Sequence, residues 1–150
     1  MKKFIFTAVL SVVAVALFAQ IKNPVQWTYA SRKKTEHVYE VVLTASLPAP
    51  WHIYSQSTPK GGPKPTIISF KNNPLAVMEG KTKELGALKT NHDENFGVDV
   101  KYYGDKVEFV QTVKLKGNVK TNITGTIEYM VCDDSQCLPP TKKDFDIKLQ

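Results

Sequence analysis

The two cysteines of this 150-residue chain are the residues whose type and spacing most directly suggest chemistry. Four residues separate them in the stretch Tyr129-Met130-Val131-Cys132-Asp133-Asp134-Ser135-Gln136-Cys137-Leu138-Pro139-Pro140. A connection this short can hold two sulfurs within disulfide-bonding distance. The resulting disulfide could be a structural cross-link, or it could exchange with the thiols of other proteins.

The size of the ring and the strand pattern bear on this choice. In the chain-entropy model, closing a ring of six residues stabilises a fold by about 2 kcal/mol, against about 5 kcal/mol for a loop of 100 residues. A short ring is therefore a weak cross-link and fits exchange better. If Tyr129 and Val131 point into the core, Cys132 points away from it, where a partner's thiolate could reach the sulfur. The alternative is an immunoglobulin-like binding or adhesion module whose hairpin disulfide is purely structural.

The N-terminal residues predict export. Lys2 and Lys3 precede an uncharged apolar run that ends before Gln20, which is typical of a secretory signal peptide at residues 1–19. The run is shorter than the roughly 18 to 20 residues that span a bilayer, and no later segment is apolar enough to do so. We therefore expect residues 20–150 to form one soluble periplasmic domain. In that oxidising compartment the cysteines should be paired.

Neither nucleic acid nor a metal is an expected ligand. The formal net charge is +6, but the basic residues are scattered among acidic and apolar ones, as on an ordinary solvated surface. His37, His52 and His92 lie in separate segments without the spacing of metal ligands.

Alternating apolar and polar residues dominate the rest of the chain and predict strands. We expect an all-β, immunoglobulin-like antiparallel β-sandwich of about eight strands, with no convincing amphipathic helix. The clearest strand is 37–47, and 98–102 with 107–115 predict a hairpin around Gly104 and Asp105. Another pair is 123–131 with 145–149. Residues 58–65 predict a surface loop, and 74–91 a loop or irregular strand.

Three stretches together carry a resemblance to a known family. Tyr-x-x-Cys, a short acidic loop and Cys-x-Pro-Pro resemble the active-site hairpin in the N-terminal periplasmic domain of the bacterial thiol:disulfide interchange protein DsbD. Trp51-His52-Ile53-Tyr54 is similar to the family's aromatic early strand, and Asp93-Glu94-Asn95-Phe96-Gly97 to its acidic-aromatic-glycine loop. Two features depart from the family pattern: four residues lie between the cysteines instead of five, and Asn95-Phe96 replaces Phe-Tyr.

The resemblance implies a domain that passes reducing equivalents from a thioredoxin-like donor to oxidised periplasmic proteins, without a cofactor. It implies that Cys132 and Cys137 are the catalytic pair, supported by Tyr129, Pro139 and Pro140. The loop of Asp93, Glu94, Asn95, Phe96 and Gly97 would shield the disulfide. We expect Phe96 to be the shielding side chain because Asn95 is polar. Because the chain contains neither a membrane conduit nor a thioredoxin-like domain, we expect the donor to act in trans.

The two cysteines are expected to have different roles. In the family that the hairpin resembles, the cysteine before x-Pro-Pro forms the mixed disulfide with partners, which here is Cys137. The residues agree with this assignment. Asp133 and Asp134 disfavour a thiolate at Cys132, whereas Cys137 precedes an apolar, rigid segment against which a partner could dock. Cys132 would then be the resolving thiol.

Overall fold

A computed structural model describes residues 23–94 and 96–149 of the chain; the predicted signal peptide and Asn95 lie outside these residues. All regular elements of the described residues are strands, as the alternation predicted. They are β1 (Gln26–Lys33), β2 (Val38–Ser46), β3 (His52–Tyr54), β4 (Ile67–Phe70), β5 (Ala76–Gly86), β6 (Lys89–Asp93), β7 (Val98–Gly104), β8 (Lys106–Leu115), β9 (Thr121–Tyr129), β10 (Val131–Cys132) and β11 (Thr141–Leu149). The described residues include no helix long and apolar enough for a membrane crossing.

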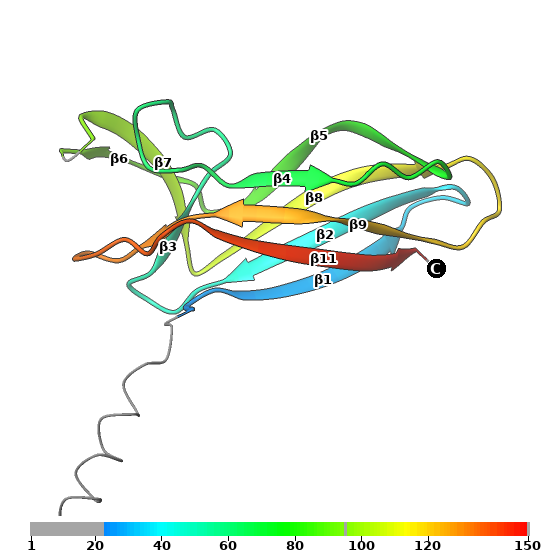
Figure 1. Ribbon diagram of the computed structural model, residues 1–150, viewed down its shortest axis with the longest axis horizontal. Coiled ribbons are helices and arrows are strands. Elements are labelled where there is room, and N and C mark those ends of the chain that lie inside the picture. Colours follow the sequence, from blue (N-terminus) through cyan, green and yellow to red (C-terminus); the bar gives the residue numbers. More distant parts are fainter. Residues whose placement is uncertain (1–22, 95, 150) are drawn as a thin grey trace, which may run out of the picture.

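The strands form three antiparallel sheets in an immunoglobulin-like arrangement (Figure 1). The sheet β1-β2-β8-β5 packs against the sheet β11-β9-β4, and the two enclose the main core. The third sheet, β10-β3-β7-β6, lies at one end of this sandwich. The predicted pairing of 123–131 with 145–149 is confirmed, because β9 pairs with β11 along its whole length.

The main core follows the alternation of the central strands. In β2 the residues Tyr39, Val41, Leu43 and Ala45 are all buried, as predicted. Apolar residues of β8, β9 and β11 complete the interior, and the most deeply buried include Phe109, Val113, Ile123 and Ile127. Burying this much apolar surface is what stabilises the fold.

The predicted hairpin of 98–102 with 107–115 is wrong. β7 pairs with β3 and β6, whereas β8 pairs with β2 and β5, so the chain changes sheets at Gly104 and Asp105. Asp105 has a φ of 64°, and its carbonyl accepts a hydrogen bond from the Leu47 amide, so the turn is bonded to the end of β2. Alternation tells which face of a strand is buried but not which strand lies beside it.

Residues 74–91 contain strand β5 and most of β6. These two strands, together with β1 and the two-residue β10, account for a total of eleven within the described residues instead of about eight. β5 lies at a sheet edge and has a register shift between Glu79 and Lys83, so it breaks the alternation that reveals a strand. Glu84 of β5 also ties the end sheet to the sandwich. Its carboxylate accepts hydrogen bonds from Ser55 Oγ (2.6 Å), the Gln56 amide (2.7 Å) and Tyr103 Oη (3.0 Å).

The end sheet has two different faces. Alternate residues of its strands, Trp51, Ile53, Tyr103 and Val131, point into the main core. Their neighbours His52, Tyr54, Tyr102 and Cys132 belong to the opposite face, as the period of two requires. One face therefore completes the main core, and the opposite face is available for a functional site.

Candidate functional site

Cys132 and Cys137 form a disulfide, and their Cα atoms lie 4.0 Å apart. The hairpin that holds them has its own backbone hydrogen bonds, from the Asp133 amide to the Gln136 carbonyl and from the Leu138 amide to the Val131 carbonyl, each 2.9 Å long. The loop is thus bonded independently of the two sulfurs.

The Asp133 carboxylate organises the loop between the cysteines. It accepts hydrogen bonds from the Ser135 amide (2.9 Å), the Ser135 hydroxyl (2.9 Å) and the Gln136 amide (2.8 Å). These bonds, led by the one from the Ser135 amide, lower the pKa of Asp133 to about 2. This carboxylate is therefore ionised and structural at neutral pH.

The two cysteines differ in exposure. Cys132 is 2% exposed and packs with Tyr54 and Val100 in a small cluster, separate from the main core. Cys137 lies in the loop and is exposed. The expectation that Cys132 points away from the main core is correct, but the expectation that a partner could reach its sulfur is wrong, because the end sheet supplies a second apolar cluster that covers it. Of the two residues, Cys137 is the accessible one.

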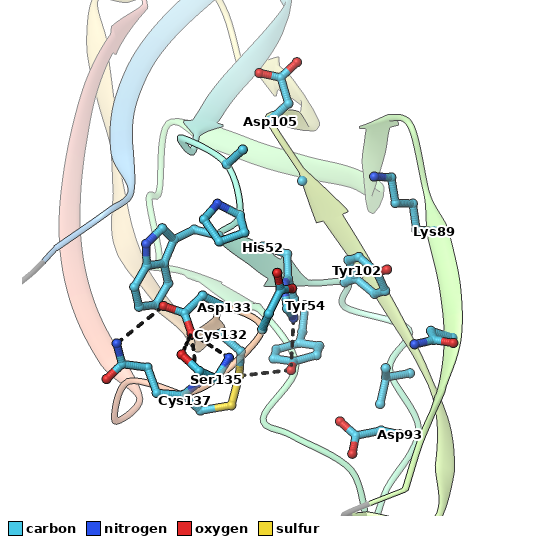
Figure 2. A pocket seen from close by; sticks show the side chains of 18 of the residues that line it. His52, Tyr54, Lys89, Asp93, Tyr102, Asp105, Cys132, Asp133, Ser135 and Cys137 are labelled. Carbon is cyan, nitrogen blue, oxygen red and sulfur yellow. Dashed lines mark hydrogen bonds between the residues drawn. A yellow bond between two sulfur atoms is a disulfide. The ribbon is translucent and has the colours of Figure 1, made fainter.

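A cleft of about 1250 Å³ opens beside the disulfide (Figure 2). Both cysteines line it, as do His52, Tyr54 and Tyr102 of the end sheet. Across the cleft lies the predicted shielding loop, of which Asp93, Glu94 and Phe96 are lining residues. The fold therefore brings the predicted loop and the predicted cysteine pair to one place.

The predicted shielding loop connects β6 with β7, and its first and last residues are hydrogen-bonded to each other. The Gly97 amide donates to the Asp93 carbonyl at 2.7 Å, and Gly97 has a φ of 65°, a conformation that suits glycine. At its base, His92 Nδ1 and Asp99 Oδ1 are 2.8 Å apart. Phe96 is 40% exposed at the cleft. Its role as the shield stays a prediction.

The side chain that does bond a sulfur is Tyr54. Its hydroxyl donates to Cys132 Sγ at 3.0 Å and lies 3.4 Å from Nε2 of His52 (Figure 2). The His52 ring also packs on Tyr102, with ring centroids 4.7 Å apart. Residues 51–54 carried part of the family resemblance, but no contact of His52 or Tyr54 with a cysteine was predicted. Alternation within 51–54 could have placed His52 and Tyr54 on one face, but not opposite Cys132.

Burial sets the protonation of these groups. It raises the pKa of Tyr54 to about 12, with Asp93 and Tyr102 adding to the effect, so the hydroxyl stays protonated. Burial also lowers the pKa of His52 from its ordinary 6.5, against a hydrogen bond to the Pro50 carbonyl and the charges of Asp134, Asp133 and Asp93. His52 is therefore neutral at pH 7.

Comparison with known proteins decides the family. Residues 20–149 match the family described as "Thiol:disulfide interchange protein DsbD, N-terminal". The chain belongs to this family. No curated protein matches the chain.

Solved structures of DsbD-type N-terminal domains share the fold. The N-terminal periplasmic domain of ScsB from Proteus mirabilis aligns with a TM-score of 0.58 at 16% identity, over 89% of this chain and 49% of that one. The chain thus spans about half of that structure. The reduced DsbD N-terminal domain of Neisseria meningitidis aligns with a TM-score of 0.55 at 16% identity, over 89% of this chain and 91% of that one. A complex of the DsbD and PilB N-terminal domains from the same organism gives 0.55 at 13% identity, over 87% of each chain.

The residues predicted to support the hairpin of this DsbD-type domain lie in two settings. Tyr129 is 1% exposed in the main core, with its ring centroid 5.4 Å from that of Trp27, and it ends β9 just before the hairpin. Pro139 and Pro140 are exposed on the chain that leaves the hairpin toward β11. Among the described residues, no cluster of three or more histidine, cysteine or acidic side chains could hold a metal ion.

Proposed function

We propose that this DsbD-type domain carries reducing equivalents by thiol-disulfide exchange through Cys132 and Cys137. The observation that carries the proposal is the asymmetry of the disulfide, which has one exposed cysteine and one buried cysteine at the edge of a cleft. An exchanging disulfide needs one sulfur that a partner can reach and one that leaves and later returns.

The exchange is a pair of displacements at sulfur. A donor thiolate attacks Cys137 Sγ along the line of the disulfide, a bond forms between donor and Cys137, and Cys132 leaves with the electron pair as a thiolate. The Tyr54 hydroxyl already donates to Cys132 Sγ, so it stabilises this developing charge. A second donor thiolate then attacks the donor sulfur of the mixed disulfide, the disulfide of the donor forms, and Cys137 leaves with the electron pair as a thiolate. The two cysteine thiolates of the domain each take up a proton. The products are an oxidised donor and a domain with two thiols.

The same steps in reverse would reduce an acceptor. Cys137 of the reduced domain attacks the acceptor's disulfide, and Cys132 resolves the mixed disulfide. We propose a thioredoxin-like donor acting in trans and oxidised periplasmic proteins as acceptors. Two of the structural neighbours support this placement: one is described as a periplasmic domain, and the other is a DsbD N-terminal domain bound to another protein domain. Export would depend on the signal peptide predicted at residues 1–19.

We further propose that the loop of residues 93–97 limits access to the disulfide. Phe96 and the two cysteines line the same cleft, and the bond from the Gly97 amide to the Asp93 carbonyl closes the turn that carries Phe96. A loop that closes over a reactive group and moves aside for the correct partner is a common form of gating. Such a gate would slow indiscriminate attack on the disulfide by small thiols.

Trapping tests the exchange and the roles of the two cysteines. The partner is a thioredoxin-like protein that keeps only its attacking cysteine, activated beforehand as its mixed disulfide with thionitrobenzoate. Cys132→Ser should accumulate a stable mixed disulfide with it, because the reachable Cys137 thiolate displaces thionitrobenzoate and neither protein has a second thiol to resolve the bond. Cys137→Ser should accumulate none. Non-reducing electrophoresis and mass spectrometry measure both. The opposite pattern would exchange the two roles, and no mixed disulfide with either variant would favour a purely structural bond.

Reduction potential separates the two functions independently. A structural disulfide lies below about −300 mV, whereas an exchanging one lies above it. Equilibration of the domain with glutathione or dithiothreitol couples measures this value directly. A potential far below the glutathione range would contradict the proposal.

A further inference from the structure

The burial of Cys132 raises a question that exchange alone does not answer. Its thiol must lose a proton each time it attacks and gain one each time it leaves, yet Cys132 is only 2% exposed. Water and buffer reach such a sulfur poorly, and burial disfavours the thiolate. A path for the proton is therefore needed within the protein.

The structure contains a chain of contacts that fits this need. Cys132 Sγ lies 3.0 Å from the Tyr54 hydroxyl, which lies 3.4 Å from Nε2 of His52. His52 is partly exposed and lines the cleft, so its ring joins the buried sulfur to solvent. Strand pairing fixes the arrangement, because His52 stands directly opposite Cys132 between β3 and β10, and Tyr54 follows on the same face of β3.

We propose that His52, acting through the Tyr54 hydroxyl, moves the proton of the Cys132 thiol to and from the cleft. The proposal rests on the exchange function proposed above and adds a positioning residue to it. His52 itself does not touch the reacting sulfurs. Its ring is set by the contact with Tyr54 and by packing on Tyr102.

The proton transfer balances in both directions. When Cys132 resolves a mixed disulfide, its S–H proton passes to the Tyr54 oxygen while the Tyr54 hydroxyl proton passes to Nε2 of neutral His52. The resulting Cys132 thiolate attacks Cys137 Sγ, the disulfide of the domain forms, and the partner leaves as a thiolate with the electron pair. His52 then releases its proton to the cleft. When Cys132 is the leaving group, the His52 ring takes up a proton from the cleft and passes it to the Tyr54 oxygen while the Tyr54 hydroxyl proton passes to the Cys132 thiolate, which leaves His52 neutral again.

The surroundings of His52 suit this role. The titratable groups that face it are Tyr54 from its own strand, Tyr102 from β7, Asp93 from β6, and Asp133 and Asp134 from the hairpin. A neutral imidazole has one protonated and one unprotonated nitrogen, and the tautomer with an unprotonated Nε2 can accept the proton of the Tyr54 hydroxyl. Because burial lowers the pKa of His52, the ring can accept a proton at pH 7, whereas the pKa of Tyr54, about 12, makes the hydroxyl a carrier and not a base.

Ellman's reagent separates the two thiols in one experiment. In the reduced domain, attack by Cys137 releases the first thionitrobenzoate, and resolution by Cys132 releases the second, so rapid mixing records two phases. For the wild type, the rate of the second phase should rise with pH through the pKa of His52 and level off above it. His52→Phe keeps a ring against Tyr102 and removes the base. It should slow the second phase about 100-fold at pH 7, with a rate that climbs with pH without levelling.

The controls make each outcome decisive. His37→Phe removes a histidine at the other end of the sandwich and should leave both phases unchanged. Tyr54→Phe should reproduce the His52→Phe profile, and the double variant should be no slower, because the two residues act as a unit. If His52→Phe loses cooperative unfolding, His52→Gln replaces it. A second phase that keeps the wild-type pH profile in the histidine variant, or equal slowing of both phases at every pH, overturns the relay. A wild type without a second phase contradicts the exchange function instead.

Discussion

The main core lies between the sheets β1-β2-β8-β5 and β11-β9-β4, whereas the small cluster of Tyr54, Val100 and Cys132 lies on the outer face of the end sheet. The main core draws on nearly every strand and contains large side chains with no exposure at all. The small cluster holds a tyrosine hydroxyl and a sulfur, and it borders an open cleft. Stability and chemistry therefore depend on different sets of residues, although the two sets share strands β3, β7 and β10.

The largest expected difference between the main core and the small cluster is in the free energy of unfolding that a substitution removes. Phe109→Ala empties the centre of the main core and should lower the free energy of unfolding by about 3 to 5 kcal/mol. Tyr54→Phe removes only one hydrogen bond from the small cluster and should lower it by about 0.5 to 1.5 kcal/mol. Urea titrations followed by circular dichroism measure both. An equal or larger loss from Tyr54→Phe would show that the two clusters are not energetically separate.

Reduction of the disulfide tests whether the stability of the main core depends on the cysteine hairpin. Because the ring is small, opening it should lower the free energy of unfolding by about 2 kcal/mol and leave a single cooperative transition. Thermal melts of the oxidised domain without reductant and of the reduced domain in excess reductant provide the measurement. Loss of cooperative unfolding on reduction would mean that the disulfide is a structural element of the fold.

The loop at the cleft should affect rate and not stability. Phe96→Ala removes the side chain proposed as the shield, so reduction of the disulfide by glutathione should become severalfold faster. Ile67→Ala is the matched control, since Ile67 is an equally exposed apolar residue on β4 and does not line the cleft. An unchanged rate for Phe96→Ala would exclude this residue as the shield.

The smallest expected effect is a loss of hairpin stability at acidic pH. Asp133 has a pKa of about 2 in the folded domain against an ordinary 3.8, so its hydrogen bonds to Ser135 and Gln136 stabilise the hairpin above pH 4. That stabilisation should be lost as the pH falls from about 4 to about 2. Asp133→Ala lacks the acceptor and should not show this part of the acid dependence. Melting temperatures of both proteins across this range should converge at the acid end. If the melting temperatures of the two proteins fell in parallel with pH, the acid dependence could not be assigned to Asp133.

The sequence predicted the part of the fold that rests on alternation. β2 is the clearest case, because one face of the strand meets the main core along its whole length. The partner of β7 could not be predicted in this way. Its alternation fits a hairpin with β8 as well as a place in the end sheet, and the choice depends on the turn at Asp105.

The candidate site was predictable only where it depends on residues close together in the sequence. The spacing and surroundings of the cysteines indicated a hairpin disulfide, and the structure has it. The burial of Cys132 was not predictable, because it depends on Tyr54, which lies 78 positions away in the chain. The small cluster takes few residues from each of β3, β7 and β10, so it produces no hydrophobic periodicity in any one strand. It can be recognised only once the pairing of these strands is known.

The backbone bonds of the cysteine hairpin have a kinetic consequence. The amides of Asp133 and Leu138 hold the two strands of the hairpin by bonds in which the sulfurs take no part. After reduction, each thiol therefore stays beside the other at a very high effective molarity, because no chain entropy is lost when they meet. In the exchange proposed above, resolution by Cys132 would then be intramolecular and faster than attack by a free thiol in solution. In the wild-type domain the mixed disulfide with a partner should be short-lived, so each encounter would end in release.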